Sequence, residues 1–170
     1  MDLRNVIRDV VDFPKEGIVF KDITTILQDP KALRSSVDQF EAVLEGVEFD
    51  YIVGPESRGF IFGVPLAYNM SKGFLPVRKA GKLPYETKSK DYDLEYGSAT
   101  IEMHVDALKP GDRVVIVDDL LATGGTSRAM VELIEELGGV VVKMVYLIEL
   151  EFLGGLKQLE GYDVTSIIKY

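Results

Sequence analysis

The sequence predicts an α/β fold: a mostly parallel, twisted sheet flanked by helices. Two apolar runs, Val114–Val117 and Val140–Leu147, lack polar alternation, which is typical of strands buried on both faces of a parallel sheet. Between them, residues 127–137 carry apolar side chains at helical spacing, and Gly138-Gly139 suits the left-handed end of a helix. Strand, helix and strand in this order form a βαβ unit, which almost always crosses over right-handed.

The preceding part of the chain continues this alternation. Apolar side chains at helical spacing predict a helix over 32–44, and Tyr51–Val53 predicts the next strand. Residues Phe60–Met70 are apolar on nearly every side, so we expect a helix that is buried all round. Phe74–Val77 predicts a third strand. At 170 residues, all of this fits a single domain over 1–170.

The segment from about 81 to 97 breaks the pattern, because it is polar and shows no sustained periodicity. An irregular segment of this length inside a domain is usually disordered or a functional lid, and we interpret it as a flexible lid loop. It should end in a β-hairpin whose strand Ser98–Met103 returns to the sheet edge. We expect three lysines of this segment to reach a diphosphate: Lys82, Lys88 and Lys90. We expect four other residues to exclude water and to supply acid-base groups: Tyr85, Tyr92, Glu95 and Tyr96.

Composition narrows the class of protein. The net charge of −9 disfavours nucleic acid as a partner, because such binding depends on Lys and Arg. Cysteine is absent, and one histidine offers little for zinc chemistry. No apolar stretch approaches the roughly 20 residues that span a bilayer, and Met1–Asp12 lacks the apolar centre of a signal peptide. We therefore expect a cytoplasmic protein that does not bind membranes.

The strongest functional signal follows the strand Val114–Val117. Asp118 and Asp119 stand at its carboxyl end, where open α/β sheets bind ligands, so we expect both in a cleft, on the loop that leaves the strand. The next residues, Ala122-Thr123-Gly124-Gly125-Thr126, precede a helix, whose free N–H groups and dipole favour an anion. Paired carboxylates can accept hydrogen bonds from vicinal sugar hydroxyls. The ligand predicted by this combination is a ribose 5-phosphate.

Each piece alone is more commonly an ordinary turn or helix cap, but the complete ordered string favours a binding site. Neither a G-x-x-x-x-G-K-[ST] loop nor a G-x-G-x-x-G fingerprint occurs, which argues against nucleotide hydrolysis and NAD chemistry. Basic residues support a polyphosphate ligand. Arg58 follows the strand Tyr51–Val53 in a glycine-flanked loop, and Arg78, Lys79 and Lys82 begin a basic island in an acidic chain.

The string Val117–Thr126 resembles the phosphoribosyl diphosphate (PRPP) binding motif of the type I phosphoribosyltransferases. Its wording is similar to that of the adenine-specific members, since members for orotate or 6-oxopurines usually carry other residues at 120–123. Two more segments, Phe13–Leu27 and Gly54–Gly63, agree with this resemblance, as do Arg78–Pro84 and Leu94–Gly97. The resemblance therefore extends over nearly the whole chain.

This resemblance implies purine salvage: the 5-phosphoribosyl group passes from PRPP to adenine, giving AMP and diphosphate. It implies Mg²⁺ bound mainly through PRPP and diphosphate, with no dedicated protein metal ligand, and a homodimer. The implied catalytic residues are Glu95, Asp118 and Asp119. The implied PRPP and phosphate contacts are Arg58, Arg78, Lys79, Lys82, Tyr96, Ala122, Thr123, Gly124, Gly125 and Thr126.

For adenine, the resemblance implies a ring sandwiched by Phe20 and Leu150, with backbone groups of Val19 and Lys21 at its edge. Relatives often have arginine where Lys21 stands, which matters little if the contact is through the main chain. Two alternatives stay open. One is transfer to another purine base, namely xanthine, guanine or hypoxanthine; the other is a PRPP-sensing regulator, which should show a basic face or an added helix-turn-helix segment.

Overall fold

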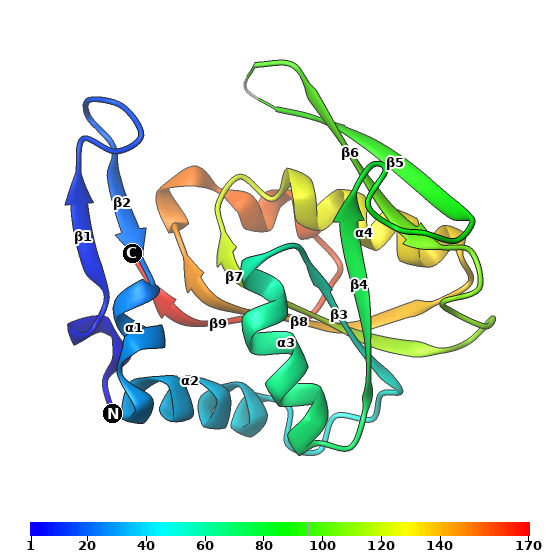
Figure 1. Cartoon of the computed structure of the whole chain (residues 1–170), viewed down its shortest axis with the longest axis horizontal. Coiled ribbons are helices and arrows are strands. Elements are labelled where there is room, and N and C mark those ends of the chain that lie inside the picture. The colour runs from blue at the N-terminus through cyan, green and yellow to red at the C-terminus, as the bar shows by residue number, and fades with distance from the viewer. Residues whose placement is uncertain (95) are drawn as a thin grey trace.

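A seven-stranded sheet, most of it parallel, forms the centre of the molecule (Figure 1). The computed structural model describes residues 1–94 and 96–170. Five strands of this sheet run parallel: β3 (Tyr51–Pro55), β4 (Gly73–Lys79), β7 (Arg113–Leu121), β8 (Val140–Glu149) and β9 (Val164–Lys169). Two antiparallel strands, β5 (Thr87–Asp93) and β6 (Ser98–His104), extend one edge, so the order is β5-β6-β4-β3-β7-β8-β9.

A second, two-stranded sheet and the helices complete the fold. The small sheet is the hairpin of β1 (Arg8–Val11) and β2 (Val19–Asp22). The α-helices are α1 (Thr24–Gln28), α2 (Pro30–Val43), α3 (Arg58–Asn69) and α4 (Gly125–Glu136), and short 3₁₀ helices span Leu3–Asn5, Glu151–Leu153 and Gly155–Leu159. In the part of the chain that the structure describes, none of the helices is both long and apolar enough to cross a membrane. The predicted α/β class and mostly parallel sheet are confirmed.

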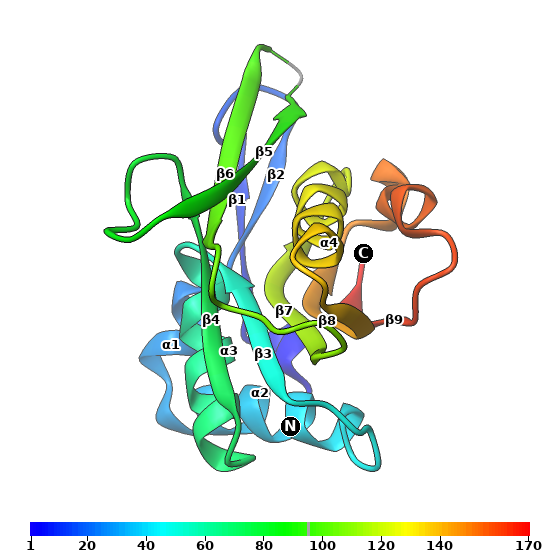
Figure 2. The ribbon, with the colours of Figure 1, turned by 90° about the vertical axis from the view of Figure 1, so that its right-hand side faces the viewer.

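Strand β7 explains why its apolar run has no polar alternation. Val115 and Val117 belong to the core beneath α2 and α3, whereas Val114 and Ile116 belong to the core beneath α4. Figure 2 shows α3 and α4 on opposite sides of the sheet, so both faces of the strand are covered. A strand that is buried on both faces needs apolar residues at every position.

The segment 81–97 contains more strand than we expected of a lid loop that ends in a β-hairpin. Its second half, Thr87–Asp93, is strand β5, which pairs antiparallel with β6 in a register that places Tyr92 opposite Ala99. This strand lies at the sheet edge, and its side chains contact charged neighbours, so it lacks the apolar alternation by which a strand is recognised. The predicted return strand Ser98–Met103 is confirmed as β6.

Helix α3 is not buried all round, contrary to expectation. Phe62 and Leu66 are fully buried in the core, but Val64 is 47% exposed and Tyr68 is 85% exposed on the opposite side. The apolar composition of this helix therefore includes an outer face that no described residue covers. Burial of one face is enough to stabilise the helix against the sheet.

Two hairpins extend beyond the carboxyl ends of the parallel strands. In Figure 1, β1–β2 and β5–β6 rise from different parts of the molecule toward the same side. Their tips meet, since the Lys15 ammonium lies 6.0 Å from the centre of the Tyr96 ring. The hairpins thus stand over the sheet edge at which α/β folds bind ligands.

Candidate functional site

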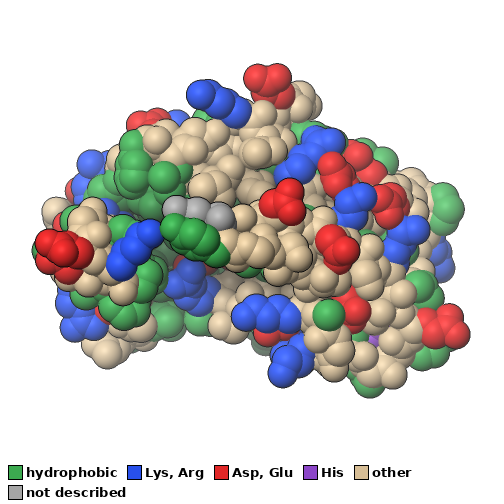
Figure 3. Space-filling model, turned by 90° about the horizontal axis from the view of Figure 1, so that it is seen from above, with side chains coloured by type: hydrophobic (Ala, Val, Ile, Leu, Met, Phe, Trp, Pro, Cys, Tyr) green, Lys and Arg blue, Asp and Glu red, His purple; other side chains and the backbone are tan. Residues whose placement is uncertain are grey.

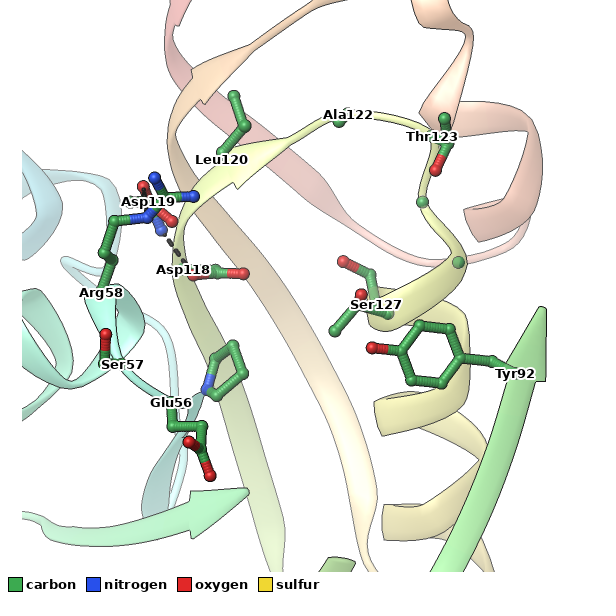
Figure 4. A pocket seen from close by; sticks show the side chains of 14 residues that line it. Glu56, Ser57, Arg58, Tyr92, Asp118, Asp119, Leu120, Ala122, Thr123 and Ser127 are labelled. Atoms are coloured by element: carbon green, nitrogen blue, oxygen red, sulfur yellow. Dashed lines mark hydrogen bonds and ion pairs between the residues drawn. The ribbon is translucent and has the colours of Figure 1, made fainter. Parts of the chain in front are cut away.

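A pocket of about 280 Å³ opens at the carboxyl ends of β3 and β7, beside the first turn of α4 (Figure 4). Neighbouring parallel strands bring their carboxyl ends to one edge, so segments more than fifty residues apart in sequence meet there. The lining residues are Pro55, Glu56, Ser57, Arg58, Tyr92, Asp118, Asp119, Leu120, Ala122, Thr123, Gly124, Gly125, Thr126 and Ser127. The predicted carboxylate pair, Arg58 and the complete glycine turn therefore share one cavity.

The two carboxylates form the bottom of this pocket. We predicted them on the loop that leaves the strand, but they belong to the last part of β7. Strand β8 extends far enough to pair with this part of β7, since Asp118 lies opposite Tyr146 and Leu120 opposite Ile148. The Asp119 backbone N–H donates to Asp118 Oδ1 at 2.8 Å. Sheet pairing thus holds the acidic pair rigidly where a flexible loop would not.

Burial dominates the electrostatics of this pair. It raises the pKa of Asp118 well above its ordinary value, and the adjacent Asp119 charge adds to the shift. Burial also raises the pKa of Asp119, although the Arg58 guanidinium opposes it. Arg58 Nε lies 2.9 Å from Asp119 Oδ2, and Asp119 is only 5% exposed. The pair is therefore poised to interact with a ligand that brings positive charge or hydroxyl donors.

The turn before α4 matches the predicted anion site. Gly124 caps the helix in a left-handed conformation with φ of 87°, and α4 begins at Gly125. A Cβ atom at Gly124 would lie 2.6 Å from the carbonyl oxygen of Gly155, so both the conformation and the space demand glycine. The backbone N–H groups in the first turn of a helix lack partners within the helix, so this turn has donors that an anion can accept from.

A second wall comes from the turn between β3 and α3. Glu56 and Ser57, joined by a cis peptide bond, line the pocket. Glu56 Oε1 accepts from the Lys79 backbone N–H at 2.7 Å and from Arg78 Nε at 3.2 Å. The Lys79 N–H chiefly lowers the pKa of Glu56, and the Arg78 charge adds to it. Arg78 and Lys79 are thereby fixed beside the pocket, though neither lines it.

Two of the remaining lid assignments, Lys82 and Tyr96, lie apart from the cavity. Lys82 is exposed and Tyr96 is 81% exposed, and neither lines the pocket, so their roles in PRPP binding stay predictions. Glu95 lies outside the described residues. Lys88 and Lys90 form ion pairs with α4 and so do not face the pocket, contrary to expectation. Alternate residues of β5 point to one side, and that side faces the helix.

The predicted adenine residues lie next to the pocket but do not line it. The Arg58 guanidinium carbon is 5.8 Å from the centre of the Phe20 ring, and the Leu150 N–H donates to the Leu121 carbonyl at 3.0 Å. Lys21 directs its ammonium to Asp9 at 2.7 Å, so its side chain is already engaged. Val19, on the same strand β2, is 46% exposed. Their contact with a base stays a prediction.

Several lining residues escaped the sequence reasoning. Glu56 and Ser57 follow strand β3 in the same way as the acidic pair ends β7, so their position after a buried strand was an available signal. Ser127 directly follows the glycine turn. Its hydroxyl accepts from the buried Tyr146 hydroxyl at 2.6 Å, and burial raises the pKa of Tyr146. That pairing joins β8 to α4 and has no sequence signature.

Comparison with known proteins adds relatives to this geometry. The family model described as phosphoribosyl transferase domain matches residues 23–167. The adenine phosphoribosyltransferase of Lachnoclostridium phytofermentans is 61% identical over 168 residues, which cover 99% of this chain and 97% of that protein. The crystal structure of adenine phosphoribosyltransferase from Thermoanaerobacter pseudethanolicus has a TM-score of 0.97 at 55% identity, covering 99% of this chain and 98% of that one.

A third relative was solved with ligands. The adenine phosphoribosyltransferase of Saccharomyces cerevisiae, complexed with D-2,5-dideoxy-2,5-imino-altritol 1,6-bisphosphate and adenine, has a TM-score of 0.92 at 40% identity. The match covers 98% of this chain and 96% of that one. Similarity at this level extends over the hairpins as well as over the central sheet.

Proposed function

Since this chain belongs to the phosphoribosyl transferase family, we propose that it is a purine salvage enzyme that transfers the 5-phosphoribosyl group from PRPP to adenine, forming AMP and diphosphate. One observation carries this proposal. The paired carboxylates Asp118 and Asp119 and the glycine turn 122–126 line the same pocket. The full-length similarity to adenine phosphoribosyltransferases supports adenine as the acceptor.

The ribose 5-phosphate part of PRPP fits the side of the pocket formed by β7 and α4. The 5-phosphate binds the backbone N–H groups at the start of α4, with Thr123 and Thr126 as hydroxyl donors. The ribose hydroxyls donate to Asp118 and Asp119. The carboxylates also place negative charge beside C1, where positive charge develops as the bond to diphosphate breaks and N9 of adenine attacks.

The diphosphate part fits the wall between β3 and β4. Arg58 lines the pocket there, and Glu56 holds Arg78 and the Lys79 backbone beside it. These groups can hold the leaving diphosphate through charge-assisted hydrogen bonds. Lys82, Tyr96 and Glu95 complete the proposed set from the lid, with Glu95 assigned to proton management at the purine.

Magnesium is the proposed cofactor. Among residues 1–94 and 96–170, no three acidic or histidine side chains gather as metal ligands, whereas Asp118 and Asp119 offer the oxygen atoms that Mg²⁺ prefers. Two carboxylates fit an ion held mainly by substrate oxygens. When bound, the ion would neutralise the diphosphate leaving group.

In the proposed complex, adenine lies between Phe20 and Leu150, and backbone groups of Val19 and Lys21 contact its edge. Arg58 supports this placement, because it lies 2.9 Å from Asp119 on one side and 5.8 Å from the Phe20 ring on the other. The base would thus lie next to the reacting carbon. A cytoplasmic location and a homodimer are also proposed; the exposed side chains of Val64 and Tyr68 on α3 support self-association.

Steady-state turnover tests the function. The protein is assayed with PRPP, magnesium and one base at a time: adenine, hypoxanthine, guanine or xanthine. Formation of nucleotide and of diphosphate is measured in each assay. We expect adenine-selective AMP formation that is lost in Asp118→Asn and Asp119→Asn. Turnover of a different purine would replace adenine as the acceptor, and PRPP binding without turnover of any base would indicate the sensor.

A further inference from the structure

Strand β5 lies along the whole length of α4. Lys88, Lys90 and Tyr92 are alternate residues of this strand, so their side chains point to one face. That face meets α4: Lys90 Nζ lies 2.8 Å from Glu136 and 3.3 Å from Glu132, and Lys88 Nζ lies 3.5 Å from Glu136. Figure 3 shows basic and acidic side chains interspersed over the right-hand half of this face of the molecule.

The direction of the two elements brings Tyr92 to the other end of the helix. Glu136 ends α4 and Gly125 begins it. Moving along β5 from Lys88 to Tyr92 therefore moves from the last turn of α4 to its first. A Cβ atom at Gly125 would lie 3.7 Å from Cδ2 of Tyr92, which places the ring in contact distance of the anion turn.

The hydroxyl of Tyr92 is directed at the cavity. Figure 4 shows the ring beside the first turn of α4 with its oxygen pointing into the pocket. Part of the ring packs on the core beneath α4, which limits its freedom. A tyrosine hydroxyl can donate a hydrogen bond to a phosphate oxygen.

We propose that Tyr92 contacts the substrate: its hydroxyl donates a hydrogen bond to the 5-phosphate that binds at the start of α4, and the ion pairs of Lys90 with Glu132 and Glu136 position it. This inference rests on the proposed function, because it assumes a phosphorylated ribose in the pocket. The hairpin then supplies a specific ligand contact in addition to a cover.

The substitution Tyr92→Phe isolates the hydroxyl, and ribose 5-phosphate is the probe because it carries neither base nor diphosphate. Calorimetry on the full chain should show a rise in Kd of about tenfold, as expected for a lost hydrogen bond to a charged group. Tyr51→Phe is the matched control, since Tyr51 begins β3 at the opposite end of the sheet; its Kd should equal that of the unmodified protein.

Lys90→Met tests the positioning role. Its Kd for ribose 5-phosphate should rise about threefold, Lys90→Arg should restore most of the affinity, and the effect of Lys90→Met should disappear when Phe already occupies position 92. Lys143→Met removes a comparable ion pair, because Lys143 on β8 lies 3.0 Å from Asp163 (Nζ to Oδ2). This substitution should leave the Kd unchanged.

The outcomes separate this inference from the proposed function. If the unmodified protein converts adenine and PRPP to AMP but Tyr92→Phe binds ribose 5-phosphate within twofold of it, the Tyr92 contact is wrong and the function stands. If Lys90→Met weakens binding equally with Tyr or Phe at position 92, the lysine does not act through Tyr92. Absence of turnover in the unmodified protein would instead reject the function.

Discussion

The floor and the roof of the pocket hold their charges in opposite ways. The floor, residues 118–127, is part of β7 and the start of α4, where sheet pairing and close packing hold the backbone. The roof consists of the hairpins β1–β2 and β5–β6. Strand β6 joins the main sheet through β4, whereas the side of β5 that faces α4 is held by ion pairs between partly exposed side chains, such as Lys90 with Glu136. Backbone pairing and packing therefore hold the floor, whereas side-chain charges contribute to holding the roof.

The pKa shifts follow the same division. Burial raises the pKa of Asp118 in the floor, so folding disfavours its charged form. In the roof, hydrogen bonds from the Thr24 backbone and from Arg8 lower the pKa of Asp22 to about 2, and a hydrogen bond from Lys90 lowers the pKa of Glu136 on the facing helix. The charge of the floor therefore lowers the stability of the fold and is available to a ligand. The charges of the roof instead stabilise the roof.

Asp118→Asn should give the largest effect and the sharpest test of this comparison. We expect kcat/KM for PRPP to fall by about 100- to 1000-fold, because a charged partner of the transition state is lost. The free energy of unfolding at pH 7 should nevertheless rise by about 1 kcal/mol, or about 2–4 °C in Tm, because a buried like charge is removed.

The pH dependence gives the sign of this effect. A carboxyl whose folded pKa is raised contributes stability that is fully present below its unfolded pKa and is lost as the pH rises through the folded value. The Tm difference between Asp118→Asn and the unmodified protein should therefore grow from acidic to neutral pH. Equal Tm values across this range would contradict the division between floor and roof.

Gly124→Ala should break the floor through its backbone. We expect a loss of about 2–4 kcal/mol in the free energy of unfolding, since the substitution combines left-handed strain with a Cβ placed 2.6 Å from the Gly155 carbonyl oxygen. Gly81→Ala, in the loop between β4 and β5, is the control, because φ is 81° there and no neighbouring atom lies within 4 Å of the added Cβ. Denaturant unfolding of both should show a loss of only about 1 kcal/mol for the control; equal losses would mean that packing at Gly124 is not decisive.

Phe20→Ala tests the ligand role of the first roof hairpin. We expect the KM for adenine to rise about tenfold through the loss of ring stacking, with the KM for PRPP nearly unchanged. Phe152→Ala, which alters an aromatic side chain that is 76% exposed, should change neither. Steady-state kinetics with each substrate varied in turn would decide, and a larger effect on PRPP than on adenine would count against the assignment of Phe20 to the base.

Asp22→Asn should give the smallest effect and tests how charge stabilises the roof. Asp22 lies 2.6 Å from Arg8, and its lowered pKa means that it contributes stability above the ordinary carboxyl range, which is lost as the pH falls toward about 2. We expect a loss of about 1 kcal/mol in the free energy of unfolding at pH 7, and this loss should shrink between pH 4 and pH 2. Thermal unfolding against pH measures it, and a constant difference down to pH 2 would contradict this origin.

The floor could be predicted from the sequence because each part of its structure requires a particular type of residue. A β-branched run predicts a buried strand, glycines at 124 and 125 predict a tight turn, and adjacent carboxylates mark the strand end. The precise end of β7 could not be predicted, because it depends on how far β8 extends beside it. The same tertiary pairing explains why the acidic pair lies in a strand and not in a loop.

The roof was harder to predict for physical reasons. Strand β5 is polar because it is the edge strand of the sheet and faces the acidic residues of α4, so its sequence resembles that of a loop. The contact of Tyr92 with the first turn of α4 arises from the alignment of two elements that are more than thirty residues apart in the chain. The outer face of α3 shows the converse, since apolar composition alone did not reveal that Tyr68 is exposed.

The ion pair between Arg58 and Asp119 makes ligand binding an exchange reaction. The guanidinium lies 2.9 Å from the carboxylate, and its carbon lies 5.8 Å from the centre of the Phe20 ring. A diphosphate that recruits Arg58 must compete with Asp119, and the released carboxylate then needs a new partner, which a ribose hydroxyl can provide. Under the proposed function, binding of the two parts of PRPP would be coupled through Arg58, so an isolated diphosphate or an isolated ribose would each receive only half of the exchange.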